Sequence, residues 1–142
     1  MSVESVLEVG VAVKNVEEAT RLFTSILGAR HVETTEVAMY QMRFSYCQIG
    51  DVMFELMEPT SENGTIADFI KRRGEGLHHI ALKVSDINET MDLMKKNNIR
   101  LIDQQPHFVE LEKGTGMVAF VHPKAFNGVM FELIQILKTK IE

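Results

Sequence analysis

The chain has 142 residues, of which 45% are hydrophobic and 25% are charged, and its formal net charge is −5. This length suits one well-filled core and is short for two independent domains. The acidic balance argues against nucleic acid as a partner, because binding to a duplex depends on clustered lysine and arginine. No apolar run approaches the roughly 20 residues that cross a bilayer, so we expect no membrane partner. The start of the chain also lacks the basic and apolar regions of a signal peptide.

The chain has a single cysteine, Cys47, so an internal disulfide bond is excluded. We expect a cytoplasmic, reducing compartment and a small, buried side chain at this position. The most basic stretch is Lys71-Arg72-Arg73. We interpret it as the solvated end of a helix, and a contact to ligand phosphate groups is the alternative.

An internal repeat predicts the architecture of the chain. Residues 8–13 align with residues 79–84 at an offset of 71, and the match continues to Asn15 and Asp86. Each copy reads as an apolar strand, a capping residue and an amphipathic helix. A glutamate three positions after each cap gives the spacing of a helix start. Gly28 is placed to end the first helix in a left-handed conformation.

The second match in the repeat is stronger than the first. Residues 52–56 and 129–133 share the identical sequence VMFEL, at an offset of 77. Because the offset grows by about six, the second copy contains extra residues. We place them in a loop over Val109–Gly116, which contains Glu110, Glu112, Lys113 and two glycines.

Alternating patterns rich in β-branched and aromatic residues predict the remaining strands. In the first copy they cover residues 31–37, 41–49 and 52–57. In the second copy they cover Arg100–Ile102, His107–Leu111 and Met117–His122, before the last strand. The segment Pro59–Gly76 joins the copies and contains a predicted helix over Thr65–Arg72, capped by Asn63 or Thr65.

These elements predict an α+β fold in which two tandem βαβββ modules form a curved mixed sheet around a central site. We expect one domain over residues 1–142. Repeat 1 spans about 5–58, a linker with a short helix spans 59–75, and repeat 2 spans about 76–136.

Four polar residues interrupt the apolar strands at positions related by the repeat. Glu8 corresponds to His79, and Glu55 corresponds to Glu132. A buried polar group without a partner costs about 1–3 kcal/mol, so such residues need a reason. If the copies pack with a pseudo-two-fold relation, all four side chains converge on one metal site with N and O ligands. The alternative is a solvated strand face with a hydrogen-bonded core histidine.

Several motifs resemble the vicinal oxygen chelate superfamily, which includes glyoxalase I and the extradiol dioxygenases. Within it the likeness is greatest to the methylmalonyl-CoA epimerase branch, and it covers nearly the whole chain. The motifs are VGVAVK at 9–14, GD at 50–51 leading into ELMEP at 55–59, RGEGLHHIA at 73–81, and VAFVHPK at 118–124 with Gly128.

The resemblance implies a metal site and its ligands. The second, third and fourth ligands fall on Glu55, His79 and Glu132, and the first, which is usually histidine in the family, falls on Glu8. Three ionised carboxylates around a divalent ion leave a formal charge of about −1, which favours Mn²⁺ or Mg²⁺ relative to Zn²⁺. The identity of the ion stays open among Co, Mn, Ni, Zn and Mg.

The resemblance also implies chemistry. It predicts a metal-dependent epimerase or racemase that acts on a 2-substituted malonyl-type acyl-CoA through an enolate, without a nucleotide cofactor. The family base of the first half falls near Phe44 or Ser45, which cannot transfer the proton, so Glu132 and Glu8 are the candidate catalytic residues. A glyoxalase I-like lyase and a non-enzymatic small-molecule-binding protein are the alternatives, and a homodimer is expected.

Overall fold

The computed structural model of the chain describes residues 2–111 and 114–139. The chain divides into two compact units, which are named here by their repeats. The first-repeat unit is Glu8–His78, and the second-repeat unit is Met1–Leu7 together with His79–Glu142. Each repeat has the element order β-α-β-β-β, so the α+β fold class and the two βαβββ modules are confirmed.

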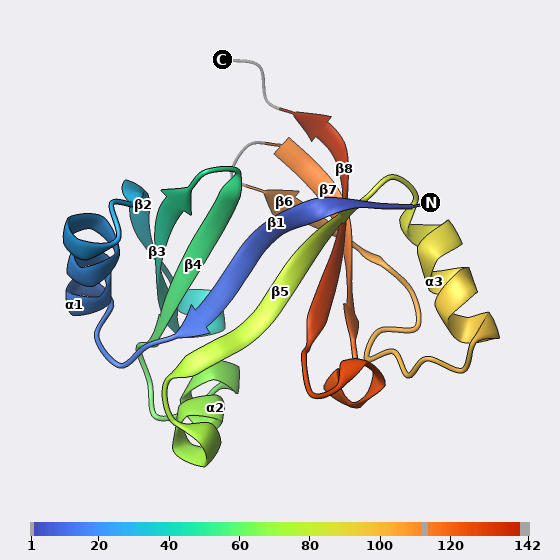
Figure 1. The fold of residues 1–142 in the computed structure, drawn as a ribbon. Helices are drawn as coiled ribbons and strands as arrows, with labels where there is room; N and C mark the ends of the chain where they lie inside the picture. The colour runs from blue at the N-terminus through green and yellow to red at the C-terminus, as the bar shows by residue number, and fades with distance from the viewer. Residues whose placement is uncertain (1, 112–113, 140–142) are drawn as a thin grey trace. The chain divides into compact units, whose positions relative to one another are not determined.

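Four strands of the first-repeat unit lie in the order β2-β3-β4-β1 (Figure 1). They are β1 (Val3–Ala12), which belongs to this unit from Glu8 on, β2 (Arg30–Val37), β3 (Met42–Ile49) and β4 (Val52–Pro59). β3 pairs antiparallel with both β2 and β4, whereas β4 runs parallel to the second half of β1. The predicted strands 31–37, 41–49 and 52–57 are confirmed, with ends that move by at most two residues.

The helix after β1 begins at the predicted cap. α1 (Val16–Arg21) follows Asn15, whose side-chain oxygen accepts a hydrogen bond of 3.0 Å from the backbone N–H of Glu18. The helix continues as the π-helix η1 (Leu22–Ile26). Gly28 then adopts a φ of +76°, as expected of a residue that ends a helix in the left-handed region.

α2 (Thr65–Arg73) lies in the segment that joins the repeats, close to its predicted bounds. The predicted cap is wrong: Gly64 precedes the helix with a φ of +116°, and no side chain of the described residues caps it. A glycine is favoured there because L side chains rarely adopt this φ. The basic stretch Lys71–Arg73 forms the last turn of α2, as predicted for a helix end.

The first-repeat unit has an apolar core on each face of its strands. The core under α1 contains Val13, Val16, Ala29, Cys47 and Leu56. The core under α2 contains Ala12, Phe44, Met57 and Ile66. Because successive strand residues point to opposite faces, the α2 core lies on the face that also carries Glu8 and Glu55.

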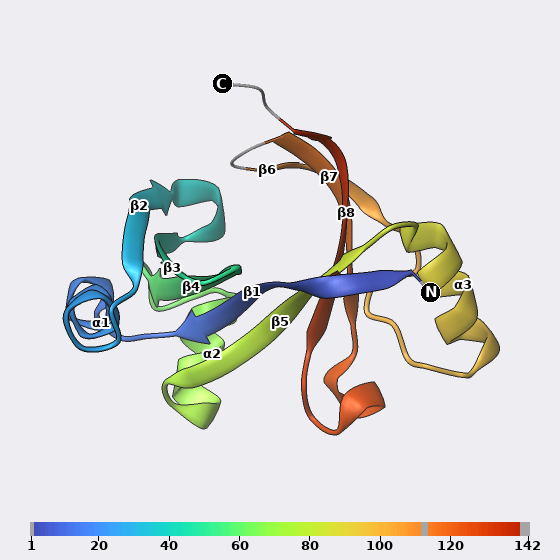
Figure 2. The same ribbon diagram turned by 45° about the horizontal axis from the view of Figure 1, so that its top comes forward.

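The second-repeat unit repeats this strand pattern in the order β6-β7-β8-β5. Its strands are β5 (Gly76–Val84), which belongs to this unit from His79 on, β6 (His107–Leu111), β7 (Gly114–Val121) and β8 (Phe131–Thr139). β5 runs parallel to β8, and β7 pairs antiparallel with both β8 and β6. Figures 1 and 2 both show β6, β7 and β8 side by side.

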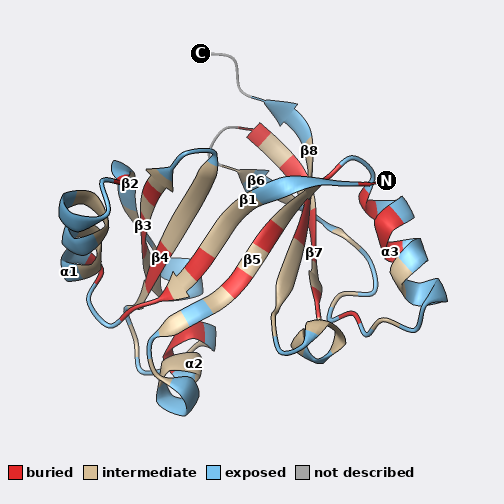
Figure 3. Ribbon diagram, viewed as in Figure 1, coloured by how far each residue is buried: buried red, intermediate tan, exposed pale blue. Residues whose placement is uncertain are grey.

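α3 (Ile87–Lys96) covers one face of these strands, and its buried residues lie on the side toward them (Figure 3). The predicted cap is confirmed, because the Asp86 side chain accepts a hydrogen bond of 3.0 Å from the N–H of Glu89. The core under α3 contains Val84, Ile87, Met91, Leu101, Ala119, Val121 and Leu133. Ala81, Val118 and Ile134 form a separate buried cluster on the opposite face, which carries His79 and Glu132.

A second side-chain hydrogen bond fixes the start of α1 and the start of α3 against a strand of the same repeat. Glu58 Oε1 on β4 accepts a hydrogen bond of 2.9 Å from the N–H of Val16, at the start of α1. Gln135 Oε1 on β8 accepts one of 2.9 Å from the N–H of Ile87, at the start of α3. The four residues keep the offsets of 71 and 77 that define the repeat. The strand that carries the candidate ligand therefore also positions the helix.

Two predictions for the second copy are wrong. The predicted strand Arg100–Ile102 is only an isolated bridge between Leu101 and Val121. The described part of Val109–Gly116 lies in β6 and β7 rather than in a loop, and Glu112 and Lys113 are outside the described residues. The longer connections are instead 97–106, before β6, and 122–130, before β8, which includes the 3-10 helix η3 (Pro123–Phe126).

Within residues 2–111 and 114–139, no helix combines the length and the apolar character needed to cross a membrane.

Candidate functional site

His79 and Glu132 form a close pair in the second-repeat unit. β5 and β8 are parallel, and Ala81 is the register partner of Glu132, so the two side chains project from the same face. His79 Nε2 and Glu132 Oε1 are 3.7 Å apart, and the side chains are 7% and 16% exposed. An imidazole and a carboxylate therefore meet where little water reaches them.

The aromatic ring of Phe120 borders this pair. Phe120 lies on β7 opposite Glu132. Its ring meets the His79 ring edge-on, with the centroids 6.1 Å apart and the planes at 81°. The buried cluster of Ala81, Val118 and Ile134 continues the same face. The pair thus has an aromatic wall on one side and an apolar floor beside it.

Glu8 and Glu55 have the corresponding arrangement in the first-repeat unit. They share a face of β1 and β4, because Gly10 is the register partner of Glu55. Tyr46 of β3 lies opposite Glu55, and both glutamates are half-buried. These three residues stand where the other unit has His79, Glu132 and Phe120. The repeat therefore produces a pair of carboxylates in one unit and an imidazole–carboxylate pair in the other.

Each pair lies within one unit, and the convergence of all four residues on one site stays a prediction. No group of three or more His, Cys, Asp and Glu side chains among residues 2–111 and 114–139 is arranged to hold a metal ion. The pair of His79 and Glu132 nevertheless fits one ion. Donor atoms bind such ions at about 2.0–2.2 Å, so two donors of one ion lie at most about 4.4 Å apart. Their separation of 3.7 Å is within that limit.

His78 belongs to the packing of α2. Its ring meets Phe69 edge-on at a centroid distance of 5.0 Å, and the guanidinium of Arg73 lies 5.8 Å from the centre of the same Phe69 ring. Burial, and secondly the positive charge of Arg73, lowers the pKa of His78. His78 is therefore a packing residue on the face of β5 opposite to that of His79.

The other residues considered from the sequence do not add an acid or a base. Phe44 and Ser45 are buried, and Ser45 Oγ is 2.7 Å from Thr20 Oγ1 on α1. Cys47 is fully buried, as predicted; burial raises the pKa of its thiol, and a hydrogen bond with Ser45 opposes that shift.

The remaining histidines lie at the surface or at an element end. His31 and His107 are exposed. His122 begins η3, where its Nδ1 accepts a hydrogen bond of 3.1 Å from the N–H of Lys124. It is therefore the cap of η3.

Two residues of the candidate site, Tyr46 and Phe120, were not predicted from the sequence. They lie nine and twelve positions before Glu55 and Glu132, respectively. Because the spacing differs, the sequence does not show that Tyr46 corresponds to Phe120. The one shared signal is an aromatic residue followed by a small apolar residue, Cys47 or Val121, in the strand before VMFEL.

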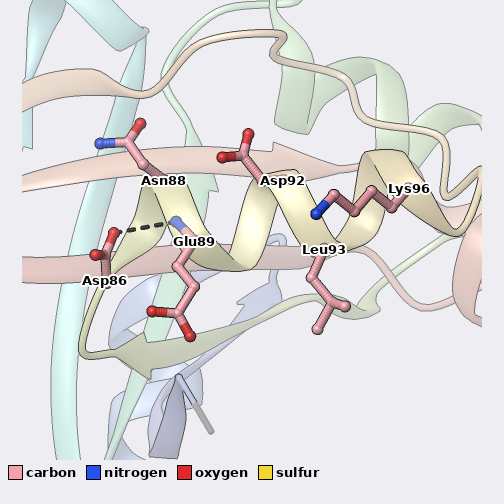
Figure 4. A pocket seen from close by; sticks show the side chains of 6 residues that line it. All are labelled: Asp86, Asn88, Glu89, Asp92, Leu93 and Lys96. Carbon is pink, nitrogen blue, oxygen red and sulfur yellow. Dashed lines mark hydrogen bonds between the residues drawn. The ribbon is translucent and has the colours of Figure 1, made fainter.

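A shallow pocket with a volume of about 460 Å³ lies along the exposed side of α3 (Figure 4). It is lined by Asp86, Asn88, Glu89, Asp92, Leu93 and Lys96. Figure 4 shows the hydrogen bond of the Asp86 cap there, and most of the other side chains extend from the helix surface. The residues around His79 do not line it, so it is the solvated face of a helix rather than part of the candidate site.

Comparisons with known proteins agree with the fold and with the resemblance carried by the sequence motifs. A family model described as the Glyoxalase/Bleomycin resistance protein/Dioxygenase superfamily matches residues 8–120. Human mitochondrial methylmalonyl-CoA epimerase is 31% identical over 128 residues, which cover 89% of this chain and 71% of the relative.

Two solved structures are also similar to this chain. A hypothetical protein from Bacillus halodurans is 30% identical, covers 100% of both chains and has a TM-score of 0.87. The methylmalonyl-CoA epimerase of Mycobacterium tuberculosis is 25% identical, with a TM-score of 0.82 and coverage of 96% of this chain and 90% of the other. The resemblance inferred from the motifs is therefore confirmed.

Proposed function

Because this chain belongs to the glyoxalase/bleomycin resistance protein/dioxygenase superfamily, we propose that it is a metal-dependent epimerase of a 2-substituted malonyl-type acyl-CoA. The relatives named methylmalonyl-CoA epimerase support the isomerase class and the type of substrate. The observation that carries the proposal is the mostly buried pair of His79 and Glu132, 3.7 Å apart. Such a pair offers a metal ligand in His79 and a base in Glu132, and a base beside the carbonyl of a thioester can remove the proton of the α-carbon.

We assign the metal ligands to both repeats: Glu8 and Glu55 from the first, and His79 and Glu132 from the second. Three carboxylates favour harder ions such as Mn²⁺ or Mg²⁺, and the imidazole also suits Co²⁺, Ni²⁺ and Zn²⁺. When bound, the ion supplies positive charge that stabilises the negative charge developing on the substrate oxygens.

Glu132 is the proposed base. Its carboxylate takes the proton from the α-carbon, and the electron pair of the broken C–H bond moves into the thioester to form an enolate. A carboxylate has two oxygens, so one can accept the proton while the other faces an ion. Glu8 is the candidate acid that returns a proton to the opposite side of the carbon and so inverts it. The Phe120 ring and the apolar floor limit competing protonation by water.

The test is the exchange of the α-proton of each enantiomer of methylmalonyl-CoA in deuterated water, with Mn²⁺, Co²⁺, Ni²⁺, Zn²⁺ and Mg²⁺ added singly. We expect exchange that requires an ion. Glu132→Gln should lower the rate by about 10²–10⁴, the usual contribution of a general base. Glu110→Gln, which changes an exposed acid of β6, is the matched control and should leave the rate unchanged. Absence of exchange with every ion would exclude the proposed reaction.

A glyoxalase I-like lyase is the second candidate, favoured by the match of residues 8–120 to a family model that includes the glyoxalases. Proton transfer beside a carbonyl is common to both reactions, so the same four residues would serve. Turnover of methylglyoxal with a thiol, in the absence of exchange on the acyl-CoA, would identify this activity.

A non-enzymatic binding protein is the third outcome. Such a protein would bind a small molecule without exchanging its protons, and atomic absorption after incubation with the five ions would show no stoichiometric metal. The homodimer and the cytoplasmic location stay predictions, and sedimentation of the purified protein tests the first of them.

A further inference from the structure

The connection between α3 and β6 holds Phe120 from outside the strands. Asp103 Oδ2 accepts a hydrogen bond of 2.7 Å from the backbone N–H of Phe120. The carbonyl oxygen of Phe120 in turn accepts hydrogen bonds from the N–H of Ile102 at 2.9 Å and of Asp103 at 3.3 Å. Both backbone polar groups of Phe120 are thus bound by two consecutive residues of one connection.

The other oxygen of Asp103 is also held. Asp103 Oδ1 lies 3.2 Å from His107 Nε2, at the start of β6. The Asp103 side chain is 21% exposed, whereas that of His107 is 62% exposed. A carboxylate that accepts bonds through both oxygens has little freedom to turn, so it fixes the backbone of Phe120 more firmly than a single bond would.

In the first repeat, a regular strand pair holds the residue that corresponds to Phe120. There Tyr46 corresponds to Phe120, and it pairs with Glu33 of the neighbouring strand β2. In the second repeat the pairing of β6 with β7 begins at His107 and Val118, so it does not reach Phe120. Asp103 belongs to the longer connection that distinguishes the second copy. At the residue that borders the candidate site, the lengthened connection therefore supplies an isolated bridge of Leu101 with Val121 and a side-chain acceptor for the N–H of Phe120, where the first repeat has a regular strand pair.

The ring of Phe120 connects this bond to His79. It meets the imidazole edge-on at 6.1 Å, and the imidazole is 7% exposed, so the ring forms part of the wall that fixes its orientation. We propose that Asp103 is a positioning residue: by holding Phe120, it holds the imidazole of His79 in the orientation in which Nε2 faces Glu132. The part of this proposal that concerns metal binding rests on the proposed function, but the orientation of His79 does not.

The test uses the full chain, first without metal. In Asp103→Ala, the N–H of Phe120 loses its acceptor, and we expect the ¹⁵N and ¹H signals of the His79 ring to shift and broaden in two-dimensional NMR. Phe120→Leu keeps Asp103 but removes the ring, and should perturb the same His79 signals. Gln135→Ala is the matched control, because it also removes a side-chain acceptor of a backbone N–H in the same unit, on the face under α3. It should leave the His79 signals in place.

The second measurement is the Mn²⁺ or Co²⁺ affinity of the same three variants, by calorimetry. Loss of a residue that orients a ligand lowers metal affinity by about 10–100-fold, and we expect the lower end for Asp103→Ala and Phe120→Leu. Gln135→Ala should bind within about twofold of the unmodified chain, a change well below that range.

The outcomes separate this inference from the proposed function. If His79 shifts in both variants but the unmodified chain binds no ion, the positioning role stands and the metal site does not. Unchanged His79 signals in a folded Asp103→Ala, or a shift equal to that in Gln135→Ala, would overturn the inference. If Asp103→Ala does not fold, Asp103→Asn keeps one acceptor oxygen, and the result from Phe120→Leu decides whether the ring orients His79.

Discussion

The two repeats place the same VMFEL strand in different surroundings. In the first-repeat unit, α2 packs on the face that carries Glu55, and Met57 of β4 is buried beneath it. In the second-repeat unit, α3 packs on the opposite face, and the face of Glu132 bears the apolar cluster around Ile134. The duplicated strands thus keep the positions of the polar side chains, while the segments between the strands determine what covers them.

The polar groups themselves have also diverged. Glu8 occupies the position of His79, and Tyr46 that of Phe120, with the same register to the strand that carries the shared glutamate. The first repeat therefore supplies negative charge and a phenol. The second supplies a nitrogen donor and an apolar ring. The two copies thus share the geometry of these positions but differ in their chemistry.

The largest expected effect comes from the repeated leucine at the end of VMFEL. Leu56 and Leu133 are both 0% exposed, so each change to alanine should cost about 2–5 kcal/mol of unfolding free energy. Urea unfolding followed by circular dichroism measures it. If the chain is one domain, as its sequence predicts, both variants shift a single shared transition. Two transitions, each sensitive to one variant, would show that the repeats unfold separately. Leu93→Ala, at a position 60% exposed on α3, is the control and should change little.

The next effect compares the side chains that bind the start of each helix. Glu58→Ala and Gln135→Ala should each cost about 1–3 kcal/mol, because a backbone N–H loses its acceptor. The cost of Glu58→Ala should be the larger, since Glu58 Oε2 also pairs with Arg43 at 2.9 Å. Glu58→Gln keeps an acceptor oxygen and removes the charge. If it costs as much as Glu58→Ala, the ion pair rather than the helix bond is the main contribution.

A smaller effect tests the divergence of the polar groups. Glu8→His gives the first repeat the donor of the second and lowers the number of carboxylates in the proposed set from three to two. We expect the ratio of Zn²⁺ to Mn²⁺ affinity to rise by about tenfold, or about 1.4 kcal/mol, because fewer carboxylates favour softer ions. Competition calorimetry measures the ratio. An unchanged ratio, with tight binding of both ions, would remove Glu8 from the ligand set.

Local signals in the sequence predicted much of the fold. Asn15 and Asp86 cap their helices as expected, since a cap involves residues only three apart. The repeat favoured a meeting of His79 with Glu132, and the register that sets Ala81 opposite Glu132 places both side chains on one face. The bonds from Glu58 and Gln135 could not be predicted, because they depend on how each helix lies against a strand about 45 residues later in the chain.

The incorrect prediction of a loop over Val109–Gly116 has a specific physical cause. Gly114 and Gly116 favour a loop in the sequence, but both lie in β7, where β8 approaches closely. A Cβ on Gly114 would lie 1.8 Å from the carbonyl oxygen of Lys138, and one on Gly116 would lie 2.9 Å from that of Gln135. Glycine in a strand often marks such an approach, and sequence alone does not distinguish it from a turn. The extra residues of the second copy include Asp103, in the connection 97–106. Its hydrogen bond to Phe120 joins residues 17 positions apart, so no local pattern in the sequence predicts it.

The smallest expected effect concerns the residue just before each donor, which is Leu7 before Glu8 and His78 before His79. Leu7 packs against the cluster around Ala81, whereas His78 packs against Phe69. Burial and Arg73 lower the pKa of His78 in the folded chain, so the unfolded chain takes up a proton more readily. Well above the unfolded pKa of about 6.5, His78 is neutral in both states and its titration does not change the unfolding free energy. As the pH drops through that value toward the lower folded pKa, the unfolding free energy falls.

His78→Leu, which installs the residue of the first repeat, removes this titration. As the pH falls from 8 to 5, the unfolding free energy of the unmodified chain should fall relative to that of His78→Leu. The difference between the two free energies at pH 8 measures the effect of packing alone. Urea midpoints at each pH give both quantities. A difference that stays constant, or that moves against the variant at low pH, would show that protonation of His78 does not weaken the folded chain. The packing of α2 on this ring would then tolerate a charge, and the contrast between Leu7 and His78 would be one of shape only.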